Sequence, residues 1–290
     1  MGALLEHLLS QSFVQGLYAF GLAHLMLALW LGRRGDLVWP RPDRAVVRSL
    51  CENFALLALN GFFAGVVFAG FYAASSTAWS SLLGWEAVAI GEGLPFWAAV
   101  LVAIVAFDFT NYWNHRMLHT RPGWGVHFLH HSDRQMTFAT SYRVHVFEHL
   151  FMTAWAALVL GWMSLPVAAV GLAGLIGSWY SKYVHCGLPF EHGPLRRVFV
   201  SPNYHRWHHC EDPQVYGKNL ADMFALWDVW FGTHHDPGTC DVPTGVADAP
   251  DDILRAQVFP FVYWWRMLRG AGPETALKTA PEAAALPDAP

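Results

Sequence analysis

The N-terminal two thirds of the chain is dominated by long apolar stretches. Residues 13–31, 50–73 and 94–113 are each about as long as a helix that crosses the hydrocarbon core of a bilayer. Two shorter apolar stretches, residues 150–164 and 167–185, flank Leu165-Pro166 and predict a hairpin that either crosses the membrane or dips into it. The pattern therefore predicts an all-α integral membrane protein with about four to five transmembrane or re-entrant helices.

The distribution of Arg and Lys orients these helices. The loop between the first two apolar stretches is rich in Arg, whereas residues 74–93 contain neither Arg nor Lys. Positively charged loops stay in the cytoplasm, so residues 94–113 return the chain to that side. We therefore expect the polar residues that follow to form a cytoplasmic, histidine-rich helical cap, with the active site on the cytoplasmic side of the membrane.

The same pattern divides the chain into three parts. Residues 1–107 are expected to be membrane anchor helices, and residues 108–269 a catalytic domain that contains the membrane hairpin at 150–185. Within that domain, the amphipathic residues 220–235 are expected to lie on the membrane surface. Residues 270–290 are rich in Ala and Pro, a composition typical of a disordered tail.

Composition agrees with a membrane protein and argues against several other classes. Hydrophobic residues make up 54% of the chain and charged residues only 14%, which is unusual for a soluble enzyme. A net charge of −4 without a basic patch argues against a nucleic-acid partner. The four cysteines are scattered without a CxxC pair, so neither disulfide staples nor a zinc ribbon is expected.

Histidine is the residue whose placement indicates chemistry. Of the 16 histidines, 14 fall between His115 and His235, and eight of these form one HxxxH and two HxxHH groups. Residues three and four apart share one helix face, so each group can direct its imidazoles toward one point. A single histidine is as often a buried or surface residue as a ligand, but three such groups are not expected by chance. The eight are His115, His119, His127, His130, His131, His205, His208 and His209.

Eight imidazoles are more than one tetrahedral metal ion can use, so two metal ions are expected. Carboxylate ligands are scarce near the groups, unlike the Glu-x-x-His sites of soluble di-iron bundles. Iron activates dioxygen, whereas zinc has no redox chemistry. A two-iron site at the mouth of a membrane helix bundle is suited to oxidising an unactivated C–H bond of a lipid.

Five motifs, in order along the chain, resemble the fatty acid hydroxylase / sterol desaturase superfamily. They are D-x3-YW-x-HR-x2-H, H-x2-HH-S, R-x-H-x2-E, P-x2-HR-x-HH and YG-x-N-x8-D-x2-FGT, at residues 108–119, 127–132, 143–148, 202–209 and 216–233. The resemblance implies a fatty acid hydroxylase-like catalytic domain at residues 108–269 under which the membrane helices lie. It also implies a centre of two iron ions, which zinc can occupy in purified protein, with O2 as the oxidant and a lipid as the substrate.

The resemblance further implies roles for single histidines. It adds His185 to the eight as a ninth metal ligand. Some members carry a second histidine four positions earlier, where this chain has Ser181, so one metal would lack a ligand unless water or another side chain replaced it. His145 and His149 are the rival ligands, and a hydrogen-bonded structural role beside Glu148 is the other interpretation of His145.

Three carboxylates are the candidate catalytic residues, because ligand imidazoles need partners that orient them. They are Asp108, Glu148 and Asp228, with Asp222 as a further candidate. Asp228 could hold the far N–H of a ligand imidazole, or it could instead cap a helix or pair with Arg206.

The leading functional hypothesis is an O2-dependent di-iron oxidoreductase that hydroxylates, or desaturates, a sterol, a fatty acyl chain or a bacterial polar lipid. No electron-carrier domain is recognisable, so a separate donor is expected as a partner: a reductase, a ferredoxin or a cytochrome. The alternatives are a metal-binding or metal-transport membrane protein and a zinc-dependent membrane hydrolase. Transport would need ionisable residues within the spans, where only His24 clearly lies, and hydrolysis an HExxH-type site, which the sequence lacks.

Overall fold

The computed structural model describes residues 44–84, 90–91, 93–246 and 253–269, and the statements that follow refer to these residues. The predicted first span, residues 13–31, and the predicted disordered tail, residues 270–290, lie outside the described residues. The described part of the chain is mostly helical, with a single isolated β-bridge between Cys210 and Thr244.

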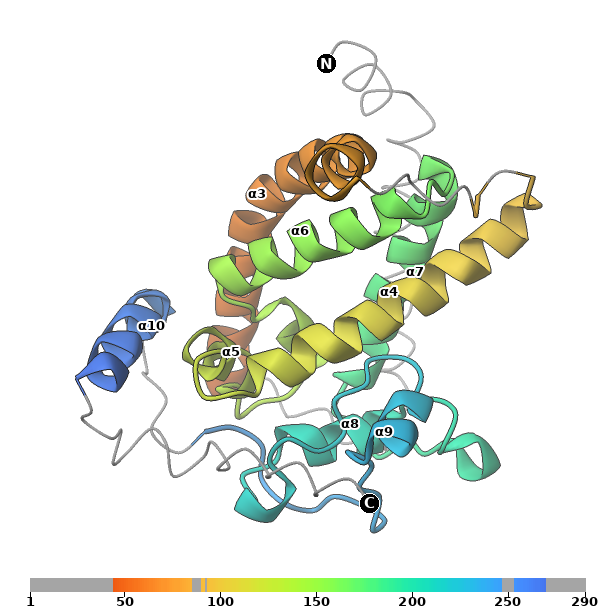
Figure 1. The fold of residues 1–290 in the computed structure, drawn as a ribbon. Coiled ribbons are helices and arrows are strands. Elements are labelled where there is room, and N and C mark those ends of the chain that lie inside the picture. The colour runs from red at the N-terminus through yellow and green to blue at the C-terminus, as the bar shows by residue number, and fades with distance from the viewer. Residues whose placement is uncertain (1–43, 85–89, 92, 247–252, 270–290) are drawn as a thin grey trace, which may run out of the picture. The chain divides into compact units, whose positions relative to one another are not determined.

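Four long helices carry the apolar stretches (Figure 1). They are α3 (Arg44–Leu83), α4 (Phe96–Leu118), α6 (Val146–Trp162) and α7 (Val167–Val184). Shorter helices carry the polar segments: α5 (Trp124–His131), α8 (Pro202–His209), α9 (Leu226–Phe231) and α10 (Ile253–Leu268). Three 3-10 helices, Phe138–Tyr142, Gly193–Leu195 and Pro213–Val215, connect them.

Among the described residues, α4 is the one helix long and apolar enough to cross a membrane, and α6 is a shorter apolar helix. The expected span at 94–113 thus corresponds to a helix that continues five residues further, to Leu118. The expected span at 50–73 lies within the 40-residue α3, which also takes up residues 74–83 that we had assigned to a loop. These residues contain neither Pro nor Gly, and the helix ends where Gly84 adopts a left-handed φ of 66°.

A sharp break separates α6 from α7 at the predicted position. Leu165 and Pro166 follow the end of α6, and Pro166 is the N-cap of α7, where its missing N–H costs no helical hydrogen bond. Residues 220–235, which we expect to lie on the membrane surface, do not form one continuous helix. Only Leu226–Phe231 is helical, and the flanking loops fold back over α4 and α8.

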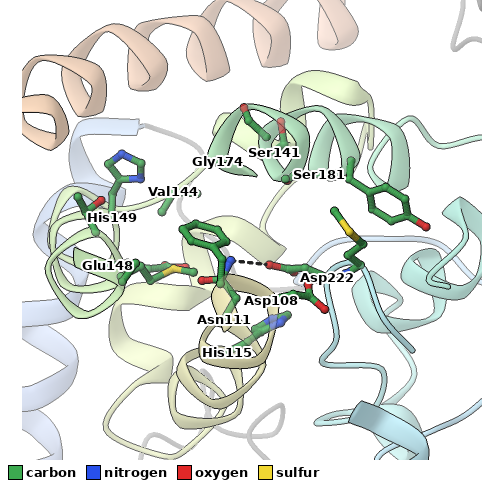
Figure 2. Close-up of a pocket in the computed structure, with 18 of the residues that line it drawn as sticks. Asp108, Asn111, His115, Ser141, Val144, Glu148, His149, Gly174, Ser181 and Asp222 are labelled. Carbon is green, nitrogen blue, oxygen red and sulfur yellow. Dashed lines mark hydrogen bonds between the residues drawn. The ribbon is translucent and has the colours of Figure 1, made fainter. Parts of the chain in front are cut away.

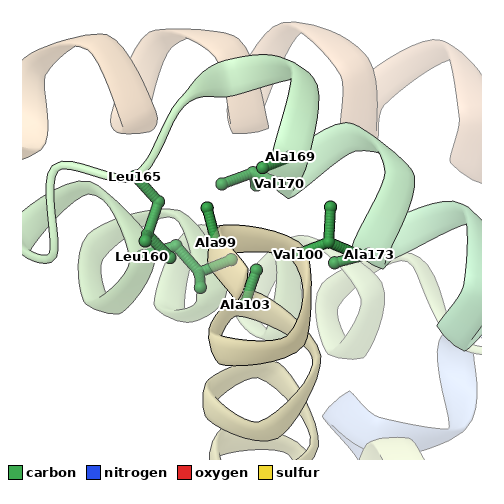
Figure 3. Close-up of a cluster of buried hydrophobic side chains, with 8 residues drawn as sticks. All are labelled: Ala99, Val100, Ala103, Leu160, Leu165, Ala169, Val170 and Ala173. Atoms are coloured by element: carbon green, nitrogen blue, oxygen red, sulfur yellow. The ribbon is translucent and has the colours of Figure 1, made fainter. Parts of the chain in front are cut away.

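The core between α4, α6 and α7 determines where the functional end of the bundle lies (Figure 3). The first turns of α4 and α7 and the last turn of α6 meet in a cluster of small and branched side chains: Ala99, Val100, Ala103, Leu160, Leu165, Ala169, Val170 and Ala173. Because α4 and α7 start in this cluster and α6 ends in it, the C-terminal ends of α4 and α7 lie at the same end of the bundle as the N-terminal end of α6. Those ends carry His115, His185 and Glu148.

Candidate metal centre

The nine histidines that the sequence indicated lie together, in two groups. The first group is His115, His119, His127, His131 and His208, and the second is His130, His185, His205 and His209. Within each group every histidine contributes one ring nitrogen to a set whose members all lie within 4.8 Å of one another. Eight of the nine are buried, and His119 is half-buried.

Two short helices supply most of these side chains, and each contributes to both groups. In α5, His127 and His131 belong to the first group and His130 to the second. In α8 the assignment is reversed, with His205 and His209 in the second group and His208 in the first. The expectation that each HxxHH group points at one place was therefore too simple. The pair at i, i+4 shares a target, and the residue between them points at the other.

Hydrogen bonds to carbonyl and carboxylate oxygens fix the ring orientation in the first group. The Nδ1 of His115 donates to the carbonyl of Leu220 at 2.7 Å, and that of His127 donates to Oε1 of Glu148 at 2.8 Å. A neutral imidazole that carries its proton on Nδ1 has a lone pair on Nε2. The Nε2 atoms of His115 and His127 nevertheless face each other at 3.1 Å.

The second group repeats this arrangement. The Nδ1 atoms of His130 and His185 donate to the carbonyls of Arg143 and Ser181, at 3.3 and 2.6 Å. Their Nε2 atoms face each other at 3.1 Å, and Nε2 of His205 lies 2.9 Å from that of His185. Unprotonated nitrogens repel one another at such distances unless a cation lies among them. Both groups therefore fit a bound metal ion.

Electrostatics keeps these imidazoles neutral, as metal ligands must be. Burial, followed by the charge of the neighbouring imidazoles, holds the pKa well below the ordinary value of 6.5 for the histidines of α5 and α8: His127, His130, His131, His205, His208 and His209. A site of neutral nitrogen donors suits iron, zinc, copper or nickel.

Of the three candidate catalytic carboxylates, Glu148 is the one that contacts a histidine of the groups. Its side chain is buried, and its second oxygen, Oε2, has no hydrogen-bond partner among the described residues. Glu148 also lines a cavity that opens beside the histidines, together with Asp222, whose carboxylate accepts from the Asn111 amide at 3.2 Å (Figure 2).

The carboxylates of Asp108 and Asp228 accept hydrogen bonds from backbone amides and not from the imidazoles of the two groups. Asp108 accepts hydrogen bonds from the amides of Met223 and Phe224, both at 2.9 Å, and from the Trp227 indole at 2.8 Å. Asp228 accepts from the amides of Leu220 and Ala221, from the Tyr204 hydroxyl and from the Thr233 hydroxyl. Together they fix the loop whose Leu220 carbonyl orients His115, so Asp228 acts on that imidazole indirectly and makes no ion pair with Arg206.

The remaining histidine candidates lie apart from the groups or are otherwise engaged. Both ring nitrogens of His145 are used: Nδ1 accepts from the Phe147 amide at 3.1 Å, and Nε2 donates to the Gln257 carbonyl at 3.0 Å. His145 is thereby the N-cap of α6 and has no nitrogen left for a metal. His149 lines the cavity but belongs to neither group, and at Ser181 the backbone carbonyl orients His185.

Sequence reasoning did not identify the carbonyl groups that orient the rings. Those of Arg143, Ser181, Lys218 and Leu220 each accept from a histidine Nδ1. Every residue has a carbonyl, so no residue type marks this role.

The cavity beside the histidines has a volume of about 280 Å³ and extends between α4, α6 and α7. Four histidines line one end: His115, His127, His130 and His185. Away from them, the lining includes Ile104, Phe107, Ala156, Ala173 and Gly174, which approach the apolar cluster of Figure 3. An apolar cavity that ends at a buried metal centre can hold a hydrocarbon and exclude water from it.

Comparison with known proteins gives one family match and several distant relatives. Residues 100–233 match the fatty acid hydroxylase family. The chain is 28% identical over 144 residues to the ornithine lipid hydroxylase OlsE of Rhizobium tropici, which covers 49% of this chain and 44% of the relative. It is 29% identical over 132 residues to the alkylglycerol monooxygenase of Homo sapiens, covering 45% of this chain and 29% of the relative.

A methylsterol monooxygenase, 1-3 of Arabidopsis thaliana, is 28% identical over 165 residues, which are 51% of this chain and 54% of the relative. The chain thus spans about half or less of the length of these relatives. No solved structure matches the chain significantly.

Proposed function

We propose that this chain, whose residues 100–233 match the fatty acid hydroxylase family, is a membrane-bound, O2-dependent oxidoreductase that hydroxylates a lipid at a centre of two iron ions. The relatives are named as a lipid hydroxylase and as monooxygenases, which supports lipid oxidation as the reaction class. Hydroxylation is preferred to desaturation on the same ground.

The observation that carries the proposal is the pair of histidine groups, in which unprotonated nitrogens converge at the end of an apolar cavity. One ion would be held by the five histidines of the first group and the other by the four of the second. Bound iron would supply the activation of dioxygen, which no amino-acid side chain provides.

The protein's own residues orient the ligands and exclude water. Glu148 keeps a proton on Nδ1 of His127, and the Leu220 carbonyl does the same for His115. The lone pair of each Nε2 therefore stays available to bind a metal ion. Ile104, Phe107 and Ala156 give the cavity an apolar wall against which a hydrocarbon can lie.

The stoichiometry requires a partner. Hydroxylation by O2 adds one oxygen atom to the carbon and reduces the other to water, so it consumes two electrons and two protons in each turnover. We propose that a separate reductase, ferredoxin or cytochrome delivers the electrons on the cytoplasmic side, where the histidine-rich end of the bundle is proposed to lie.

The test combines metal content with product formation. The full chain would be produced with iron supplementation, purified without chelator, and compared with His127→Ala, His130→Ala and the control His192→Gln, which lies outside both groups. We expect two iron ions in the parent protein and the control, and one in each alanine variant. Lipids of the producing cells should gain one oxygen atom only with the parent protein and the control. Lipid oxidation that persists in both alanine variants would refute the proposal.

A further inference from the structure

The side chains that line the cavity follow the same order along each helix. On α7 the order from the C-terminal end is a histidine, a polar pair and then small apolar residues: His185, Ser181, Ser178, Gly177, Gly174 and Ala173. A helix rises about 1.5 Å per residue, so the polar pair lies within about two turns, roughly 10 Å, of the histidine.

The other two helices repeat this order. On α4, His115 is followed by Asn111 and then by Phe107 and Ile104. On α6, Glu148 and His149 precede Thr153 and then Ala156. The cavity therefore has a metal-binding end, a polar belt and an apolar arm, and the belt separates the other two.

Lys182 lies directly behind this belt and lacks an acidic partner. Its side chain is 6% exposed, and Nζ donates to the Ser178 carbonyl and to Ser178 Oγ, both at 2.9 Å. The ammonium also lies 4.5 Å from the centre of the Tyr142 ring. No carboxylate in the described part of the chain forms a salt bridge with it.

Arg143 is a comparably buried cation, but it has an acidic partner. It is 7% exposed and pairs with Glu52 at 3.0 Å. Buried charges in proteins are normally paired, because removing an ion from water costs several kcal/mol. The contrast indicates that the anion for Lys182 comes from outside the described part of the chain.

The side chains of the belt have hydrogen-bond donors that are not used within the described part of the chain and that such an anion could accept from. Since Lys182 donates to Ser178 Oγ, the Ser178 hydroxyl keeps its own hydrogen for another acceptor. The side chains of His149, Thr153 and Ser181, which line the same belt, make no hydrogen bond to any described residue. Three acidic residues line the cavity, and each already has a partner: Glu148 has His127, Asp222 has Asn111, and Asp108 has the amides of Met223 and Phe224.

We propose that Ser178, backed by Lys182, binds an anionic group of the substrate, a carboxylate or a phosphate, while the alkyl chain occupies the apolar arm. The hydroxyl donates to the anion and accepts from the ammonium, so the positive charge strengthens the hydrogen bond that Ser178 donates. The anion then lies within about two helical turns of the histidines, and the oxidised carbon lies close to the head group. This inference rests on the proposed function.

Binding of three amphiphiles with the same saturated chain tests the inference: a fatty acid, a phosphatidic acid and a primary alcohol. Their dissociation constants would be measured on the purified, metal-loaded full chain by competition with a fluorescent fatty acid. We expect one of the two anions to bind at least tenfold more tightly than the alcohol. A preferred fatty acid identifies a carboxylate site, and a preferred phosphatidic acid a phosphate site. Equal binding of all three would overturn the inference.

Variants assign the preference to the residues. Lys182→Met should remove the preference for the anion and leave the affinity for the alcohol within about threefold, and Ser178→Ala should reduce the preference. Lys182→Arg, which keeps the charge, should retain most of it. Arg266→Met is the control, because Arg266 is an exposed basic residue on α10 that does not line the cavity. An anion preference that survives in Lys182→Met would overturn the inference.

Measuring metal content and lipid oxidation distinguishes a failure of this inference from a failure of the proposed function. A parent protein that holds iron and oxidises lipid without an anion preference leaves the proposed function standing and refutes the role of Lys182. A parent protein that shows the preference but neither iron nor oxidation refutes the proposed function instead. The product gives an independent check: we expect the new oxygen next to the anionic end, and an oxygen at the methyl end of the chain would contradict the inference.

Discussion

The two histidine groups differ in how firmly the protein orients them. In the first group, His115, His127 and His208 each use Nδ1 to donate to a fixed acceptor: the Leu220 carbonyl, Glu148 and the Lys218 carbonyl. In the second group, His130 and His185 have such acceptors, whereas Nδ1 of His205 and of His209 is buried without a partner among the described residues. Among the described residues, a carboxylate, that of Glu148, hydrogen-bonds to a histidine of the first group and none to a histidine of the second.

Hydrogen bonds to ligand imidazoles fix the ring orientation and raise ligand basicity, and their loss typically costs 10–100-fold in metal affinity. The first group also has one more ligand than the second. The comparison therefore predicts a tightly bound metal ion in the first group and a more exchangeable one in the second.

Acid should lower the folding stability of the metal-free protein. In the folded protein the six histidines of α5 and α8 have pKa values well below 6.5, whereas in the unfolded chain they titrate near 6.5. Below pH 6.5 the unfolded chain thus binds more protons, and stability falls by about 1.4 kcal/mol per pH unit for each histidine. Above pH 6.5 these groups contribute no pH dependence.

The measurement is the thermal unfolding of metal-free and metal-loaded protein in detergent between pH 5 and pH 8. We expect the metal-free protein to lose stability steeply below pH 6.5 and the metal-loaded protein to resist, because bound metal competes with protons for the same nitrogens. A metal-free protein as stable at pH 5 as at pH 7 would contradict the burial of neutral imidazoles.

Asp228→Asn should disturb the first group and spare the second. The substitution replaces an acceptor of four hydrogen bonds with a side chain that brings its own donors against the amides of Leu220 and Ala221. A loss of about 3 kcal/mol in unfolding free energy is expected, together with weaker metal binding where Leu220 orients His115. Calorimetry and metal titration measure both effects, and unchanged affinity at both sites would separate Asp228 from the metal centre.

Glu148→Gln should have the smallest effect on folding stability and should weaken metal binding in the first group only. The amide can still accept from Nδ1 of His127 but carries no negative charge. We expect the affinity of the first group to fall about 10–100-fold and that of the second to stay constant. Chelator-driven release, which should be biphasic in the parent protein, would then become closer to a single phase. A variant that still releases metal in two well-separated phases would show that the carboxylate does not set the difference.

The sequence predicted those features that depend on local spacing. Apolar length predicted α4, and the Leu165-Pro166 break predicted the separation of α6 from α7. Histidine spacing predicted eight of the nine side chains that converge, and the resemblance to a known family added the ninth, His185. It did not predict that α3 continues to Leu83, because absence of a helix breaker is a weaker signal than its presence.

Sequence spacing also failed where tertiary contacts decide. A helix face is defined by positions three and four apart, but whether a face meets one ion or two depends on the helices packed against it. The effect of Asp228 on His115 could not be predicted either, because it acts through the backbone amides of Leu220 and Ala221, which no residue type marks. Lys182 has no distinctive sequence context, and what marks it is burial without an acidic partner among the described residues.

The alternation within α5 and α8 has a further consequence. His130 and His131 are consecutive residues, yet they belong to different groups, and His208 and His209 are divided in the same way. One peptide unit therefore bridges the two metal positions on each helix, and its covalent length limits how far they can separate. A rotation of either helix that improved one coordination sphere would misalign the other. Two ions bound there would thus be held as a single rigid unit, whose spacing could not be changed at one position independently of the other.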